Sequence, residues 1–262
     1  MTEAILAGLS GLLIGSFLNV CIYRLPRDLS VVRPRSHCPS CERMISWYDN
    51  LPLISWLLLG RRCRHCQASI SARYPAVELL TGLLFFAGIY LFGPTVAGAK
   101  ICLFSAIMID LIFTDFEERI LPDEFTLGGA LAGIALAAWA PPAAFFQLFF
   151  PDTLPPRLFA VLESALSAVL LAGLLWSIGA LYARIRGREG LGFGDVKMVA
   201  CIGAFLGLSP AVLTIMFGSL LGSVVGLSYI AFTKRDARTY ELPFGSFLGI
   251  AAVLVALLRP GY

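Results

Sequence analysis

The stretch FAVLESALSAVLLAGLLWSIGALY, residues 159–182, carries a single charged side chain, Glu163. A hydrocarbon core about 30 Å thick needs roughly 20 apolar residues of helix, so this stretch can cross a bilayer. Seven further apolar blocks lie at 3–23, 76–93, 96–114, 125–147, 196–209, 211–232 and 244–258, with prolines interrupting some of them. The sequence therefore predicts an all-α polytopic membrane protein with about eight transmembrane helices.

The composition supports this class. Apolar residues make up 58% of the 262 residues, charged residues only 14%, and the mean hydropathy is +0.82. Soluble domains carry about 25% charged residues, so a water-soluble globule is excluded, and so are disorder, collagen, coiled coil and an extracellular disulfide scaffold. Because no basic region precedes the first block, we expect a retained helix there rather than a secretory signal.

The basic residues predict the orientation. The only long polar segment, residues 24–75, contains nine arginines, and the net charge of +3 says less than this clustering. Under the positive-inside rule this loop is cytoplasmic, and eight spans place the loops at 115–124, 183–195 and 233–243 on the same side. We expect a multi-pass protein in contact with lipid, with no nucleic-acid partner.

Two CxxC pairs lie in the long loop. Cys38 and Cys41 form the first pair, Cys63 and Cys66 the second, and 21 residues separate them. This spacing is typical of zinc ribbons with four thiolate ligands, and a reducing cytoplasm disfavours disulfides. We interpret 24–75 as a small zinc-ribbon-like domain; a redox pair and a loop without a ligand are the alternatives. The apolar segment 51–60 is too short to span, so we expect it at the interface or against the helices.

Carboxylates occur at predicted span ends, where ionisable groups are costly and indicate function by default. Asp115 follows the third span and Asp195 precedes the sixth, and the predicted topology puts both at cytoplasmic helix ends. Two adjacent carboxyls share one proton, which is the chemistry of aspartic proteolysis. Gly192 and Gly194 would let the backbone bend and approach an extended peptide.

Two other interpretations of these acids stay open at this point. Asp195 is also suited to capping the sixth helix, with Asp115 simply ending the third. In the second alternative, Asp110, Asp115 and Asp195 relay protons or bind cations in a transporter. That alternative gives no role to the cysteine loop.

Several motifs together resemble those of the prepilin leader peptidases, the membrane aspartic proteases of type IV pilus and type II secretion systems. The resemblance covers nearly the whole chain. It is carried by GSFLNVCIYRLP at 15–26, the paired CxxC motifs, RYPAVE at 73–78, TD at 114–115 with LPD at 121–123, GFGDVK at 192–197 with Ala200, and LPFG at 242–245.

The resemblance implies a catalytic pair of Asp115 and Asp195, with Gly192, Gly194 and Lys197 in support. It implies cleavage of basic leaders from prepilins or pseudopilins after a Gly, at the cytoplasmic face of the bacterial inner membrane. Because the cysteine loop is present, it also implies N-methylation of the new N-terminus with S-adenosylmethionine, for which Asn19, Arg24 and Glu78 are weak binding candidates. We thus expect a first helix at 1–23, a methyltransferase-associated zinc loop at 24–75 and a peptidase core at 76–262.

Overall fold

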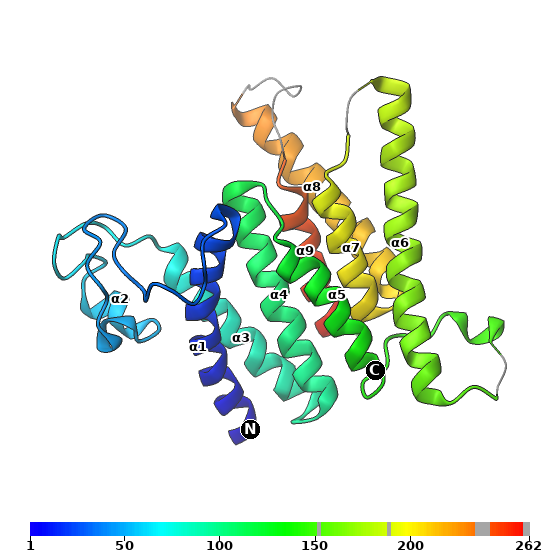
Figure 1. Cartoon of the computed structure of the whole chain (residues 1–262), viewed down its shortest axis with the longest axis horizontal. Helices are drawn as coiled ribbons and strands as arrows, with labels where there is room; N and C mark the ends of the chain where they lie inside the picture. Colours follow the sequence, from blue (N-terminus) through cyan, green and yellow to red (C-terminus); the bar gives the residue numbers. More distant parts are fainter. Residues whose placement is uncertain (151–152, 188–189, 234–241, 259–262) are drawn as a thin grey trace. The chain divides into compact units, whose positions relative to one another are not determined.

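The computed structural model describes residues 1–150, 153–187, 190–233 and 242–258. Helices dominate, and within these ranges the extended pairing is limited to two isolated bridges. Each of the eight apolar blocks contains a helix (Figure 1). The helices are α1 Thr2–Arg24, α3 Arg73–Phe92, α4 Val96–Glu118, α5 Asp123–Ala137, α6 Pro156–Arg186, α7 Phe193–Leu206, α8 Leu208–Thr233 and α9 Phe244–Leu258.

The helices differ in their capacity to cross a bilayer. By length and composition, α1, α3, α4, α6 and α8 are long and apolar enough to span. The remaining three, α5, α7 and α9, have 15, 14 and 15 residues. The chain is a multi-pass membrane protein, and the total of eight spans stays a prediction. The predicted inside loop at 233–243 lies largely outside the described residues.

Two predicted helix boundaries are wrong. The fourth block, expected at 125–147, is helical only to Ala137, because the adjacent prolines 141 and 142 lack the N–H groups that a helix needs. The break expected at Pro210 falls at Gly207, which has a φ of +83° and whose added Cβ would lie 2.5 Å from the Ala143 oxygen. Pro210 instead lies in the first turn of α8, where its missing N–H costs little.

The chain divides into two compact units, Met1–Asp110 and Leu111–Tyr262, so α4 begins in the first and ends in the second. In the first unit α1 packs along α3, and two glycines make this contact close. A Cβ on Gly11 would lie 2.8 Å from the Phe85 Cβ, and one on Gly15 would lie 2.7 Å from the Glu78 Cα. Small residues spaced by four thus allow the two backbones to approach.

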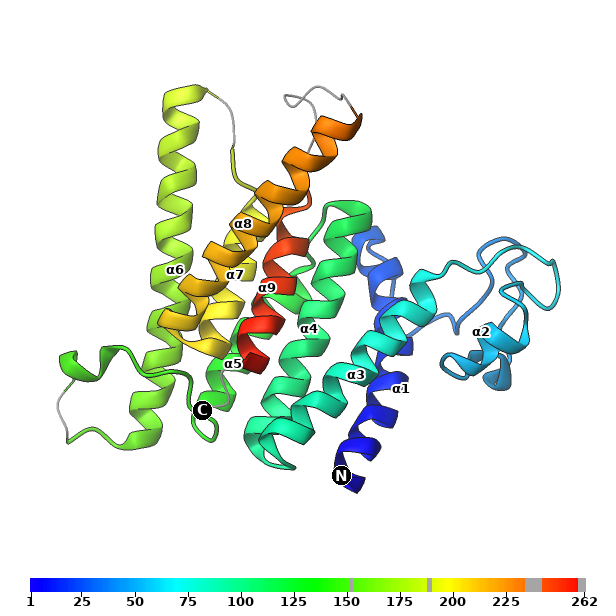
Figure 2. The same ribbon diagram turned by 180° about the vertical axis from the view of Figure 1, so that it is seen from behind.

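The second unit is arranged around α7, which contacts α5, α6, α8 and α9 (Figure 2). Its middle residues, among them Met198, Cys201 and Ile202, are fully buried. Ser164 of α6 donates a hydrogen bond to the Ala204 carbonyl at 2.7 Å, and Gly203 brings the backbone of α7 against that of α6. This packing fixes the C-terminal half of α7, and Asp195 lies in the first turn of the same helix.

The polar loop between α1 and α3 contains three short helical turns, η1 Leu25–Arg27, η2 Trp47–Asn50 and α2 Ile54–Leu58. The last lies in the apolar segment 51–60. Leu53, at its start, donates its backbone N–H to the Glu78 carboxylate of α3 at 2.8 Å. The segment therefore rests against the helices, as one of the two expectations had it. Leu57 and Leu58 remain exposed on its other side.

Candidate functional site

The four loop cysteines converge. The sulfurs of Cys38, Cys41, Cys63 and Cys66 all lie within 4.8 Å of one another, and those of Cys38 and Cys66 are 3.8 Å apart. Zinc–sulfur bonds of about 2.3 Å in a tetrahedron require sulfurs about 3.8 Å apart, so the set fits a zinc ion closely. Neither neighbouring histidine belongs to this group of potential ligands in the described residues.

The two CxxC turns have matching backbone structure. Cys38 N–H bonds to the Arg43 carbonyl at 2.9 Å, and Cys63 N–H bonds to the Ala68 carbonyl at 2.8 Å. The residue after each second cysteine, Glu42 or Gln67, has a positive φ that reverses the chain. Backbone N–H groups of Cys66 and His65 also bond to the Cys63 sulfur and lower the pKa of that thiol to about 7, which favours the thiolate that binds metal.

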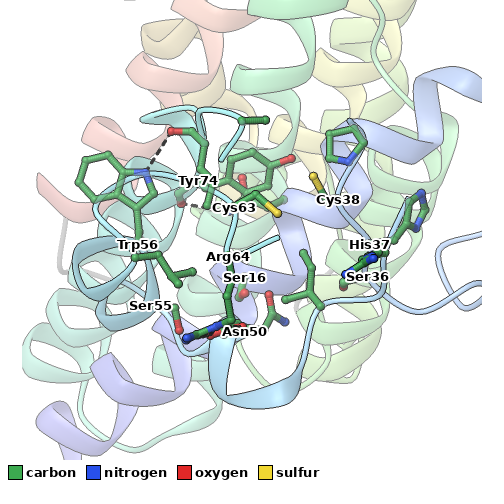
Figure 3. Close-up of a pocket in the computed structure, with 18 of the residues that line it drawn as sticks. Ser16, Ser36, His37, Cys38, Asn50, Ser55, Trp56, Cys63, Arg64 and Tyr74 are labelled. Atoms are coloured by element: carbon green, nitrogen blue, oxygen red, sulfur yellow. Dashed lines mark hydrogen bonds and ion pairs between the residues drawn. The ribbon is translucent and has the colours of Figure 1, made fainter. Parts of the chain in front are cut away.

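A cavity of about 200 Å³ lies between this loop and the membrane helices of the first unit (Figure 3). Ser16 and Asn19 of α1 line it from one side and Glu78 of α3 from another. Loop residues that include Asn50, Trp56 and Arg64 complete the wall. Its position beneath the cysteines makes it the candidate ligand site of this unit.

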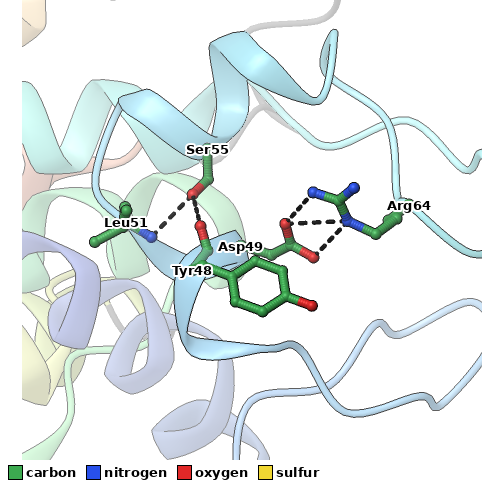
Figure 4. A network of polar contacts seen from close by, with 5 residues as sticks. All are labelled: Tyr48, Asp49, Leu51, Ser55 and Arg64. Carbon is green, nitrogen blue, oxygen red and sulfur yellow. Dashed lines mark hydrogen bonds and ion pairs between the residues drawn. The ribbon is translucent and has the colours of Figure 1, made fainter.

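One loop wall of the cavity is fixed by an ion pair. The Arg64 guanidinium donates to both carboxylate oxygens of Asp49, with Nη2 at 2.6 Å from Oδ1 and Nε at 2.9 Å from Oδ2 (Figure 4). These hydrogen bonds hold the pKa of Asp49 below its ordinary value, against a smaller opposing effect of burial. Next to it, the Ser55 hydroxyl bridges the Tyr48 carbonyl and the Leu51 N–H at 2.9 Å each.

The three residues suggested for the methyl donor all line this cavity, but their contacts differ. The Arg24 guanidinium donates to the carbonyls of Ser30, Pro34 and Arg35, at 2.9, 2.8 and 3.5 Å. Arg24 therefore ties the start of the loop to the end of α1. Asn19 and Glu78 line the cavity from α1 and α3 and are both largely buried.

In the second unit, Asp115 lies one turn before the end of α4 and is 6% exposed. Its Oδ2 accepts a hydrogen bond from the backbone N–H of Ser246, in the first turn of α9, at 2.7 Å. The Ser246 hydroxyl lies 2.9 Å from the same oxygen and 2.9 Å from the Ile112 carbonyl, so its single O–H is shared between these two acceptors. A Cβ on Gly245 would lie 3.2 Å from this carboxyl group. The glycine leaves the space that the carboxyl needs.

Asp195 is the third residue of α7 and is partly buried. Its carboxyl interacts electrostatically with that of Asp115 and accepts a hydrogen bond from the Gly192 N–H, so pairing and a capping contact occur together. Gly192, the N-cap, has an ordinary extended conformation, with φ −67° and ψ 136°. The expectation that a bend at this position requires glycine is therefore wrong. An added Cβ on Gly192 would lie 3.2 Å from the Asp195 Oδ2, so the glycine instead provides space for that carboxyl group.

Leu121 connects the helix ends around the two carboxyls. Added Cβ atoms on Gly194 and Gly245 would each lie 3.2 Å from its side chain, so the starts of α7 and α9 meet at this residue. Lys197 forms an ion pair with Asp123 at the start of α5 and lies over the Phe193 ring. The supporting residue Lys197 thus joins α7 to α5.

Sequence reasoning did not identify Ser246, Asp49 or Leu53. Ser246 directly follows the LPFG motif at 242–245, so its position beside a motif was a usable signal. The pairing of Asp49 with Arg64 and the Leu53 contact to Glu78 depend on how the loop folds back. Nothing in their local sequence indicates it.

The fold and the two candidate sites define a class of protein. It is a multi-pass helical membrane protein with a four-cysteine loop and two neighbouring aspartates near helix ends. Residues 102–227 match the type IV leader peptidase family, and residues 9–92 match the bacterial peptidase A24 N-terminal domain. The chain belongs to the type IV leader peptidase family. No solved structure matches it.

Three relatives illustrate the similarity. The prepilin leader peptidase/N-methyltransferase of Myxococcus xanthus is 42% identical over 88% of this chain, a match that spans 64% of the relative's own length. The type 4 prepilin-like proteins leader peptide-processing enzyme of Escherichia coli is 36% identical, over 97% of this chain and 94% of the relative. The prepilin leader peptidase/N-methyltransferase of Stutzerimonas stutzeri is 35% identical over 95% and 88%. These matches give no support to the transporter alternative.

Proposed function

We propose that this chain is a membrane aspartic endopeptidase that removes the basic leader from type IV prepilins or type II secretion pseudopilins, after a Gly, and that it also N-methylates the new N-terminus. The observation that carries the peptidase is the meeting of two carboxyls from distant parts of the chain, Asp115 on α4 and Asp195 on α7, within one compact unit. Family membership agrees with this chemistry.

The hydrogen bonds support different roles for the two aspartates in this proposal. Two donors from Ser246 stabilise a negative charge on Asp115, so this residue is the ionised member and takes a proton from the attacking water. Asp195, close to that charge, keeps the shared proton and donates it in a hydrogen bond to the scissile carbonyl oxygen.

The membrane itself positions the substrate. The hydrophobic helix of a pilin partitions into the bilayer, which brings the bond between leader and helix to the depth of the aspartates. The arginine-rich loop supports a cytoplasmic position for the site, in the inner membrane of a bacterium. Gly192, Gly194 and Gly245 leave room around the carboxyls for an extended peptide.

The second activity belongs, in this proposal, to the loop at 24–75 and the helix ends that it covers. S-adenosylmethionine supplies an activated methyl group when bound. Cys38, Cys41, Cys63 and Cys66 would hold a zinc ion, which would join the two CxxC turns and so support the cavity wall. The relatives named as N-methyltransferases support this assignment.

The test uses the full-length chain reconstituted in liposomes with a prepilin and labelled S-adenosylmethionine. We expect mass spectrometry to show a free leader that ends in Gly and a mature pilin whose N-terminus carries the label. An intact prepilin after incubation would contradict the peptidase. A cleaved but unlabelled pilin would contradict only the second activity.

A further inference from the structure

The cavity beneath the cysteine loop presents two acceptor groups from neighbouring membrane helices. Gly15 of α1 touches the backbone of Glu78 on α3, and Asn19 lies one turn further along the same face of α1. Asn19 and Glu78 therefore line the cavity from neighbouring turns of the two packed helices. Loop residues such as Trp56 and Arg64 line the same cavity (Figure 3).

Glu78 is 7% exposed and has only neutral partners. Its Oε2 accepts the Leu53 N–H at 2.8 Å, and the Ser16 hydroxyl donates a further hydrogen bond to the carboxylate. A buried carboxylate is costly unless a cation or several donors compensate its charge. The arrangement therefore suits a positively charged ligand that enters the cavity.

Asn19 supplies a second acceptor. Its side-chain nitrogen donates to the carbonyls of Tyr74 at 3.0 Å and Gly15 at 3.3 Å, which fixes the orientation of the amide. Its Oδ1 is buried and has no hydrogen-bond partner among the residues that the structure describes, and Asn19 is 3% exposed. Unsatisfied buried oxygens are rare in native proteins and call for a specific explanation.

We propose that the Glu78 carboxylate and the Asn19 Oδ1 bind a primary ammonium group, the α-ammonium at the new N-terminus of the mature substrate. An ammonium offers three N–H donors and a positive charge, which matches an amide oxygen and a carboxyl group that the bound cation would stabilise in its ionised form. The inference rests on the proposed methyltransferase function and names where its acceptor binds.

The depth of the two groups favours the substrate's ammonium over that of the methyl donor. Both lie on the membrane helices α1 and α3, whereas loop residues form the cytoplasmic part of the wall. A mature pilin begins directly with its hydrophobic helix, so its N-terminus stays close to the bilayer. The water-soluble methyl donor has no such constraint and can enter from the loop side.

The test compares two peptides of the mature N-terminus, one with a free α-amine and one without the amino group, for binding to the full-length chain in detergent. We expect the wild type to bind the free amine about tenfold or more tightly, the typical gain from hydrogen bonds to a charged group. Glu78→Gln, which keeps an acceptor for the Leu53 N–H, should reduce the ratio to less than about twofold. Thr81→Val, one turn further along α3 and outside the cavity, should keep it.

Leader cleavage by the same preparations reports whether each variant is folded. Equal binding of the two peptides by the wild type, or an unchanged ratio in Glu78→Gln, would overturn the inference. A third outcome would also overturn it: Glu78→Gln binds S-adenosylmethionine more weakly while the ratio between the two peptides stays unchanged. In that case the ammonium group bound at Glu78 would be that of the methyl donor. A wild type that shows the binding preference but transfers no methyl group would contradict the proposed second activity instead.

Discussion

At the scale of single residues, Ser246 is the most informative addition to the candidate peptidase site. It holds Asp115 through its backbone N–H and its hydroxyl, at 2.7 and 2.9 Å. Ser246→Ala removes the hydroxyl and leaves the N–H, so we expect kcat for leader cleavage to fall about tenfold with little change in KM. Steady-state kinetics with a prepilin substrate measure this.

Ser246→Thr, which restores the hydroxyl, should recover most of that rate. A purely structural role of Ser246 would show as loss of folded protein in Ser246→Ala without a selective effect on kcat. Equal kcat in wild type and Ser246→Ala would contradict the assignment of Asp115 as the ionised member.

The ion pair of Asp49 and Arg64 gives a prediction with a defined pH dependence. The Arg64 hydrogen bonds hold the pKa of Asp49 below its ordinary value, so the carboxylate stabilises the folded loop above that value and loses its effect only as pH falls through the lowered pKa. Because an ion pair with a solvent-exposed partner contributes little to stability, Asp49→Asn should open the loop only severalfold more often than the wild type.

Hydrogen exchange of the loop amides measures this difference between Asp49→Asn and the wild type. We expect the difference to stay constant from pH 8 to pH 5, where Asp49 remains ionised. Asp28→Asn, a matched substitution at an exposed position before the cysteines, should have no such effect. A difference that disappears between pH 7 and pH 5 would mean that the pKa of Asp49 is raised rather than lowered.

At the scale of elements, the contact of α1 with α3 depends on glycine. A Cβ on Gly11 would lie 2.8 Å from both the Phe85 Cβ and the Thr81 carbonyl oxygen. Gly11→Ala should therefore lower the free energy of unfolding by about 1–3 kcal/mol, the usual cost of overpacking. Gly173 of α6 has no atoms within 4 Å of an added Cβ, so Gly173→Ala is the control and should cost nothing. Equal stability of the two variants in detergent unfolding would contradict the close packing.

The cysteine loop predicts a structural metal. We expect about one zinc per chain by metal analysis of the purified protein, and loss of that zinc in Cys38→Ser or Cys63→Ser, because each removes one of four thiolate ligands. Cys102→Ala, which alters a buried cysteine of α4 outside this group, should keep the metal. Metal-free wild-type protein, or full zinc in both serine variants, would argue against the ribbon.

At the scale of the whole molecule, the positions of the helices could be predicted from the apolar blocks of the sequence, because a bilayer requires long apolar segments. Each of the eight blocks contains a helix. The helix ends were predicted less well. Pro141 and Pro142 terminate α5 earlier than hydropathy indicated, and Gly207 rather than Pro210 separates α7 from α8. Hydropathy averages over a window, whereas one residue's φ or missing N–H ends a helix.

The candidate site was predictable where a motif contains its own chemistry. The cysteine spacing and the GFGD segment identify Cys38, Cys63 and Asp195 from the sequence alone. The contacts of Ser246 with Asp115 and of Leu53 with Glu78 join residues 131 and 25 positions apart. Such contacts follow from tertiary packing, and neither local propensity nor spacing specifies them.

The measurement that tests the central claim most directly is leader cleavage by Asp115→Asn and Asp195→Asn, each purified and inserted in liposomes. Asparagine keeps the shape of each side chain but cannot share the proton, so the account predicts that each single variant loses cleavage essentially completely while still inserting and binding zinc. Cleavage at the wild-type rate by either variant would contradict the claim that the two carboxyls act together.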